Sequence, residues 1–316
     1  MKFYNVFKRV ILFGAILVII VSVFLVVKNV NEKEEENVDK NNGTTTSVDT
    51  VPSDDKDKDV EPPFTAPGEE GKDRENGERE TPPKKDKEKP VEKPEEDRPQ
   101  VAIIVDDLGY NPDLDQELYQ LDHPLTLAVL PFRSHTQETA ETFESKDNFE
   151  LLLHLPLEPM DEKHKEEKMA TVDMTREEIV SFLDDSLKDL EGVEGINNHK
   201  GSRFTSDETR MGYLLEEIRQ RDLFFVDSYT LADSVGYPLA SEMGIPTARR
   251  DVFLDYNDDK QAIIDELQRL EGIARENGTA IGIGHHRENT MQALKEELPR
   301  MKKRGVELVV ISEVLK

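Results

Sequence analysis

Apolar and polar positions alternate along residues 99–316 in a pattern that predicts strands and helices in turn. Short apolar runs rich in β-branched residues predict buried strands, and longer amphipathic stretches between most of them predict helices. The predicted strands cover 101–105, 125–130, 150–155, 193–197, 223–227, 247–254, 279–284 and 307–311. The clearest predicted helices cover 175–190, 207–221, 258–277 and 290–304. The pattern therefore predicts an α/β domain.

Capping signals support the ends of three of these helices. Two helices begin at or just after a capping-box pattern, Thr175-x-x-Glu178 and Thr205-x-x-Glu208, in which side chains satisfy free backbone amides. Gly278 follows the helix predicted over 258–277, and glycine is favoured at that position because it adopts left-handed backbone angles without strain.

Repeated alternation of strand and helix indicates parallel strands joined by right-handed crossovers. Both an open doubly wound sheet and a closed barrel satisfy this pattern. No glycine-rich phosphate loop follows the first strand, which ends in Asp-Asp-Leu-Gly at 106–109. The absence of that loop argues against a nucleotide-binding domain.

The region before residue 99 has a different composition. Residues 1–9 are predicted to be a cytoplasmic tail, and the uninterrupted apolar run 10–27 is just long enough to span a bilayer. Positive charges before this run place the amino end in the cytoplasm and the remainder outside, which predicts a single-pass protein of the cell membrane. Residues 28–98, rich in Glu, Lys, Asp and Pro, predict a disordered acidic linker.

Charge and cysteine content narrow the chemistry. The chain carries a formal net charge of −27, which argues against nucleic acid as a partner because phosphate contacts require Lys and Arg. It contains no cysteine, so any metal must be held by His, Asp or Glu.

The first strand ends in two adjacent carboxylates, Asp106 and Asp107. Like charges at the end of a buried strand are unfavourable unless a cation or hydrogen-bond donors compensate them. The pair therefore indicates a metal site, although a simple polar turn explains the same residues.

Most other predicted strands also end in residues suited to metal or proton chemistry. These residues are His154, His199, the pair Asp227 and Ser228, Arg250 and His285. The carboxyl ends of parallel strands meet at one edge of a sheet, where ligands and catalytic groups collect. We therefore expect these side chains to converge on one site.

Six motifs in this order resemble the divergent polysaccharide deacetylases, a branch of the NodB-like carbohydrate esterases. They are Ile-Val-Asp-Asp-Leu-Gly (104–109), Leu-Leu-His-Leu-Pro-Leu-Glu-Pro (152–159), Asn-Asn-His-Lys-Gly-Ser-Arg-Phe-Thr (197–205), Phe-Val-Asp-Ser-Tyr-Thr (225–230), Asp-Val-Phe-Leu-Asp (251–255) and Ile-Gly-Ile-Gly-His (281–285). The resemblance covers residues 99–316 and implies an irregular, NodB-like (β/α) barrel of about seven parallel strands.

The resemblance also implies roles for individual residues. Asp106 is expected to act as the base, Asp107 as a metal ligand and His285 as the general acid. Ordinary members supply two further ligands from one His-x-x-x-His segment, which this sequence lacks, so His154 and His199 are expected to replace it. Both aspartates can serve one site only if the backbone turns there, which Gly109 permits.

Four more residues are expected to bind substrate or to support the metal ligands and the base. Arg203 or Arg250 is expected to hold Asp106 ionised and oriented. Asp227 is expected to accept a hydrogen bond behind the ligands, and Ser228 belongs to the same group.

The implied activity is a metal-dependent deacetylase, with zinc as the expected ion, that removes N-acetyl groups from a cell-envelope polysaccharide. Two alternatives remain from sequence. One is a non-catalytic domain on the same barrel that binds carbohydrate or a protein partner, and the other is a different metal-dependent amidase or esterase. The sequence leaves the oligomeric state open.

Overall fold

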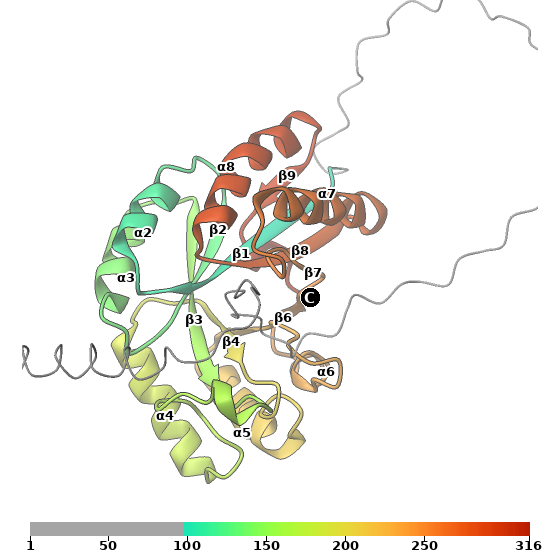
Figure 1. The fold of residues 1–316 in the computed structure, drawn as a ribbon. Coiled ribbons are helices and arrows are strands. Elements are labelled where there is room, and N and C mark those ends of the chain that lie inside the picture. The colour runs from blue at the N-terminus through green and yellow to red at the C-terminus, as the bar shows by residue number, and fades with distance from the viewer. Residues whose placement is uncertain (1–97) are drawn as a thin grey trace, which may run out of the picture. The chain divides into compact units, whose positions relative to one another are not determined.

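The computed structural model describes residues 98–316, which form a curved parallel sheet surrounded by helices (Figure 1). The strands are β1 (Gln100–Leu108), β2 (Leu125–Val129), β3 (Phe149–Leu157), β4 (Gly195–Lys200), β5 (Phe224–Asp227), β6 (Thr247–Arg249), β7 (Val252–Phe253), β8 (Thr279–His285) and β9 (Glu307–Val309). The α-helices are α2 (Pro112–Tyr119), α3 (Thr136–Glu144), α4 (Arg176–Asp189), α5 (Glu208–Gln220), α6 (Gly236–Glu242), α7 (Lys260–Asn277) and α8 (Glu288–Lys303). Two 3₁₀ helices, η2 (Glu162–His164) and η3 (Ile311–Val314), complete the fold.

All paired strands run parallel, in the order β6-β5-β4-β3-β2-β1-β8-β7, with β9 beside the first half of β1. The two outermost strands, β6 and β7, are separated in sequence only by Arg250 and Asp251. The amide of Arg250 donates to the Asp227 carbonyl of β5, and that of Asp251 donates to the Ile281 carbonyl of β8. The chain thus crosses from one margin of the sheet to the other. The predicted irregular α/β barrel is confirmed, with nine parallel strands in residues 98–316 where about seven were predicted.

The segment 247–254 differs from its prediction as one strand. It forms β6 and β7 with a crossing between them, because its two halves bond to strands on opposite margins of the sheet.

Helix capping is confirmed at two predicted positions and corrected at a third. Thr175 and Glu178 form a complete capping box at the start of α4, and Gly278 ends α7 with φ of 88°. Helix α5 begins at Glu208, close to its predicted start at 207, but its N-cap is Asp207 and not Thr205, since the Asp207 side chain accepts the amide of Arg210.

The two faces of the sheet bury different sets of apolar residues, as strand alternation requires. In β1, Ile103 and Val105 pack in the large cluster that includes the helices. Ala102 and Ile104 belong to a smaller cluster on the inner face, which includes residues of η3 such as Ile311. The apolar inner positions fill one end of the barrel, and the inner positions that follow them along the strands are free to carry polar side chains.

The predicted location in the cell membrane is contradicted. Within residues 98–316, no helix is both long enough and apolar enough to cross a bilayer. The longest, α7, has 18 residues but carries charged side chains along its exposed face. The predicted tail (1–9), anchor (10–27) and linker up to residue 97 lie outside the described residues.

Candidate active site

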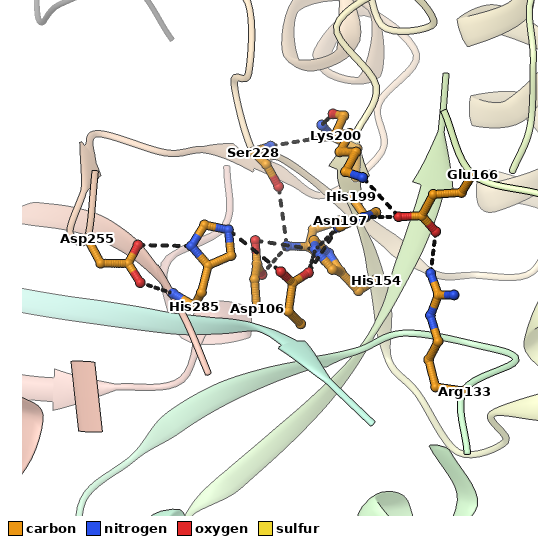
Figure 2. Close-up of polar contacts among 12 residues, drawn as sticks. Asp106, Arg133, His154, Glu166, Asn197, His199, Lys200, Ser228, Asp255 and His285 are labelled. Carbon is orange, nitrogen blue, oxygen red and sulfur yellow. Dashed lines mark hydrogen bonds and ion pairs between the residues drawn. The ribbon is translucent and has the colours of Figure 1, made fainter. Parts of the chain in front are cut away.

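Five polar side chains continue the inner face of the sheet beyond its apolar end. Each lies two residues after an inner apolar or small residue, as with Asp106 after Ile104 and His285 after Ile283. The same spacing gives His154, Asn197 and Ser228 on β3, β4 and the end of β5. Strand alternation alone therefore brings these five residues to one end of the barrel (Figure 2).

Asp107 joins this group because the backbone turns at that residue. Its φ is +65°, in the left-handed region, and the register of β1 with β2 shifts between Val105 and Leu108. A regular strand would point Asp107 toward the helices, away from Asp106. The predicted turn is therefore present, but it is made at Asp107 itself as well as at Gly109, whose φ is +108°. A left-handed non-glycine residue costs about 1–3 kcal/mol and occurs preferentially at functional sites.

The structure brings the three predicted metal ligands together. One potential ligand atom from each of Asp107, His154 and His199 lies within 4.8 Å of the other two. Oδ1 of Asp107 is 3.3 Å from Nε2 of His154 and 2.9 Å from Nδ1 of His199, and the two ring nitrogens are 3.2 Å apart. Ligands about 2.0–2.1 Å from a tetrahedral zinc ion lie about 3.3 Å from one another. The donor set and its spacing therefore fit a zinc ion.

The electrostatics of the three residues point the same way. Oδ1 of Asp107 is buried and faces one ring nitrogen of each histidine. Burial opposes ionisation of Asp107, but the charge of His199 and contacts with both histidines lower the pKa of Asp107 well below its usual value. Burial likewise opposes the charged form of His199, but Asp107 and Glu166 raise its pKa to about 9. A proton on His199 thus balances the partly buried Asp107 carboxylate, and a divalent cation can replace that proton.

Asn197 orients His154. Its Oδ1 lies 2.8 Å from Nδ1 of the imidazole, so Nδ1 carries the proton and Nε2 presents its lone pair to Asp107 and His199. Its Nδ2 donates to Oδ1 of Asp106 at 2.8 Å. Asn197 thus fixes one ligand and the predicted base together, a role that the sequence analysis did not assign.

Asp106 and His285 occupy positions suited to proton transfer. Burial raises the pKa of Asp106, although the charges of His154 and His285 partly oppose this effect. Oδ1 of Asp255 is 2.9 Å from Nδ1 of His285, and Asp255 also accepts the His285 amide and the Thr290 hydroxyl. Burial opposes the charged form of His285, yet Asp255 and Asp107 raise its pKa to about 8. Asp255 is a second supporting residue that the sequence analysis did not assign.

Ser228 and Arg250 lie at the site. Ser228 Oγ accepts from Asn197 Nδ2 at 3.3 Å. Arg250 donates from Nε to the Ser228 carbonyl and from a terminal nitrogen to that of Tyr229, and burial lowers its pKa to about 10. Its guanidinium lies 5.0 Å from the centre of the Phe253 ring.

Arg203 and Asp227 differ from their predicted positions. Arg203 donates to Glu158 at 3.1 Å, and among the described contacts neither Arg203 nor Arg250 pairs with Asp106. Asp227 accepts the amides of Tyr229 and Tyr237 and the Ser234 hydroxyl, so its carboxylate stabilises the loop before α6 and the start of that helix. Its side chain is on the opposite side of β5 from the site, since it alternates with the inward-facing Val226 and Ser228.

A further carboxylate, Glu166, reaches the site from the loop between η2 and α4. Its Oε1 is 2.8 Å from Nε2 of His199 and 3.0 Å from Nζ of Lys200, and Oε2 contacts the Arg133 guanidinium (Figure 2). Although burial opposes the charged form, these three contacts lower the pKa of Glu166 below its usual value.

The site opens into a pocket of about 140 Å³. Its lining includes the three candidate ligands, Asp106 and His285, together with Pro159 and Phe253 from the surrounding loops. The candidate ligands and both candidate proton-transfer residues therefore line the same small pocket.

The chain is similar in sequence to two bacterial proteins and in structure to a third. The chain is 30% identical over 196 residues to the uncharacterized protein YibQ of Escherichia coli (strain K12), covering 62% of this chain and 61% of YibQ. It is 28% identical over 198 residues to an uncharacterized protein of Haemophilus influenzae, covering 63% and 70% of the two chains. The crystal structure of uncharacterized protein ATU2773 from Agrobacterium tumefaciens C58 superposes with a TM-score of 0.65 at 26% identity, covering 69% of this chain and 89% of that one.

The sequence profile of one family, described as divergent polysaccharide deacetylase, matches residues 103–315. The matched region runs from within β1 to the end of η3 and contains every residue of the candidate site. This chain therefore belongs to the divergent polysaccharide deacetylase family.

Proposed function

We propose that this protein is a metal-dependent deacetylase that removes N-acetyl groups from a polysaccharide. The observation that carries the proposal is the convergence of one carboxylate and two imidazoles, with ligand atoms within 4.8 Å of one another, beside a candidate base and a candidate acid. Zinc is the proposed ion because a set of one carboxylate and two imidazoles suits it.

Asp107, His154 and His199 would hold the ion. When bound in such a site, zinc polarises a carbonyl oxygen and lowers the pKa of a water molecule toward neutrality. Asn197 fixes the ring orientation of His154, and the left-handed turn at Asp107 presents its carboxylate to both rings.

Asp106 is proposed to accept the proton of the attacking water. It is held by the Asn197 amide on one side, and its Oδ2 lies 3.6 Å from Nε2 of His154. Because burial raises its pKa, Asp106 is a stronger base than an exposed aspartate.

His285 is proposed to donate a proton to the departing amine. With a pKa of about 8, its imidazole is mostly protonated at pH 7, which suits a general acid. Its Nε2 lies 3.8 Å from Oδ2 of Asp107, so His285 reaches the same small volume as the candidate ligands. Asp255 binds Nδ1 and leaves Nε2 as the nitrogen that faces the site.

The test is acetate release from N-acetylglucosamine oligomers by the full chain with added Zn²⁺ or Co²⁺. We expect activity from the wild type, and we expect His199→Ala to lose zinc affinity by more than about 100-fold because a ligand is removed. His123→Ala is the matched control, since His123 precedes β2 at the opposite end of the sheet and should leave zinc binding unchanged. Stoichiometric zinc in purified His199→Ala would show that the ligand assignment is wrong.

The same assay separates the alternative functions. Zinc binding with release of acetate only from O-acetylated sugars would indicate an esterase. Zinc binding with no release from either substrate would indicate a binding domain on this barrel.

A further inference from the structure

Glu166 is a charged group that the proposed mechanism does not use directly. It lies on the loop that follows β3, and its carboxylate contacts residues from two other segments, Arg133 after β2 and the pair His199 and Lys200 on β4. Its side chain is 20% exposed, so the carboxylate is largely withdrawn from solvent. A carboxylate in such a position is stable only when charged partners compensate it, and Arg133 and Lys200 each supply one positive charge.

The contact with His199 determines which ring nitrogen can bind a cation. An ionised carboxylate only accepts hydrogen bonds, so Nε2 of His199, 2.8 Å from Oε1, carries the proton. A neutral imidazole carries one proton, and Nδ1 is then left with its lone pair. Nδ1 is the nitrogen that lies 2.9 Å from Asp107 and 3.2 Å from His154.

The two histidines are therefore held in opposite orientations by different partners. His154 uses Nδ1 for the Asn197 oxygen and presents Nε2, whereas His199 uses Nε2 for Glu166 and presents Nδ1. The rings are tilted at 72° with centroids 4.9 Å apart, so the presented nitrogens meet without the rings overlapping.

We propose that Glu166 is a positioning residue that holds His199 in the tautomer and orientation needed to bind the metal through Nδ1. Arg133 and Lys200 occupy the remaining acceptor sites of the carboxylate and fix it against the ring. This role rests on the proposed metal site and adds to it a residue that lies between the motif at 152–159 and the motif at 197–205.

The experiment compares the zinc affinity of full-length wild type, Glu166→Gln and Glu166→Ala by competition with a chromophoric chelator. Loss of a group that orients a metal ligand typically lowers metal affinity about 10- to 100-fold. We expect a loss near the lower value for Glu166→Gln, whose amide oxygen can still accept from Nε2, and a larger loss for Glu166→Ala. Glu167→Gln is the matched control because Glu167 is exposed on the same loop, and its affinity should stay within about twofold of wild type.

A second readout distinguishes positioning from simple fastening of the loop. In zinc-loaded wild type, long-range ¹H–¹⁵N spectra should show His199 protonated at Nε2 with slow proton exchange, and Glu166→Ala should lose this protected proton. A thermal melt of each variant checks folding, and if Glu166→Ala does not fold, Glu166→Gln decides the question.

Unchanged zinc affinity in both folded Glu166 variants, or His199 protonated at Nδ1 in the wild type, would overturn the role of Glu166 and leave the metal site intact. Absence of zinc binding by the wild type would instead overturn the metal site and this role together.

Discussion

Two clusters of buried charge in this domain are built on different principles. One joins α7 and α8, where Arg304 lies 2.5 Å from Glu271 and 2.6 Å from Glu297, and Arg275 lies 2.6 Å from Glu271. The other is the site at the end of the barrel, where Asp106, Asp107, His154 and His199 face one another without any arginine or lysine in direct contact with either aspartate among the described residues.

The difference lies in where the positive charge comes from. In the helix cluster, burial opposes ionisation of Glu271, but Arg304 and Arg275 lower its pKa, so the charges balance within the chain. In the site, the compensating charge is a proton on His199, whose Nδ1 lies 2.9 Å from Oδ1 of Asp107. A guanidinium stays charged and cannot be replaced by a metal ion. An imidazole can lose its proton and bind a metal ion in its place.

The largest effect that sharpens this comparison is expected from Asp106→Asn. Removal of a general base typically lowers kcat about 10²- to 10⁴-fold, while the three metal ligands remain. Zinc affinity should therefore stay within a few-fold of wild type. Thermal stability should not fall either, since the substitution removes a buried charge. Rates of acetate release together with a zinc titration test this.

Asp113→Asn, on the exposed surface of α2, is the control for Asp106→Asn. A large loss of zinc affinity in Asp106→Asn would contradict the separation of base and ligands.

Arg304→Ala should lower the stability of the fold without changing the zinc affinity of the site. Its removal leaves Glu271 and Glu297 without their shared partner, and breaking a buried pair in this way costs about 3–5 kcal/mol when both groups are fully buried. Because Arg304 is 39% exposed, we expect about 2–3 kcal/mol in the free energy of unfolding, measured by urea denaturation, with unchanged zinc affinity.

Arg269→Ala is the matched control, since Arg269 on α7 pairs with Glu266 and both side chains are exposed, and it should cost less than about 1 kcal/mol. Equal losses in the two variants would show that the helix cluster does not depend on its buried carboxylates.

The smallest effect concerns pH. The pKa of His199 in the metal-free protein is raised from 6.5 to about 9, so zinc must displace one proton from this ring at neutral pH. Apparent zinc affinity should therefore rise about tenfold for each pH unit between pH 7 and 8.5 and level off above pH 9. Without metal the sign is reversed, because the stabilisation from protonated His199 is complete below pH 6.5 and is lost as pH rises through about 9.

Calorimetric zinc titrations at several pH values, corrected for buffer protonation, measure the slope. A zinc affinity that does not change between pH 7 and 8.5 would mean that His199 is already neutral before metal binds.

Sequence patterns located the site because strand alternation is a local property. Asp106, His154 and His285 each stand two positions beyond an inner apolar residue of their own strand, and a reader of the sequence can count that spacing. The same counting would have assigned Asn197 to the inner face and excluded Asp227. The family assignment follows from the same local motifs.

Other features depend on contacts between residues far apart in the chain. Glu166 binds a histidine 33 positions later, and Asp255 binds His285 30 positions later. No spacing rule predicts these pairs, because their distance is set by how the loops after neighbouring strands fold back over the barrel. The prediction for Arg203 differs from the structure for the same reason. Its partner, Glu158, lies 45 positions earlier in the chain, and only the folded chain shows that the two side chains are in contact.

The sequence by itself determined most of the strands and helices, the family and the strand ends that carry the chemistry, since each follows from local periodicity and composition. The tertiary structure decided the turn that brings Asp107 beside Asp106, the nitrogen that each histidine presents, and the partners that hold them. Those features depend on backbone angles and through-space contacts, which a linear pattern of residues does not encode.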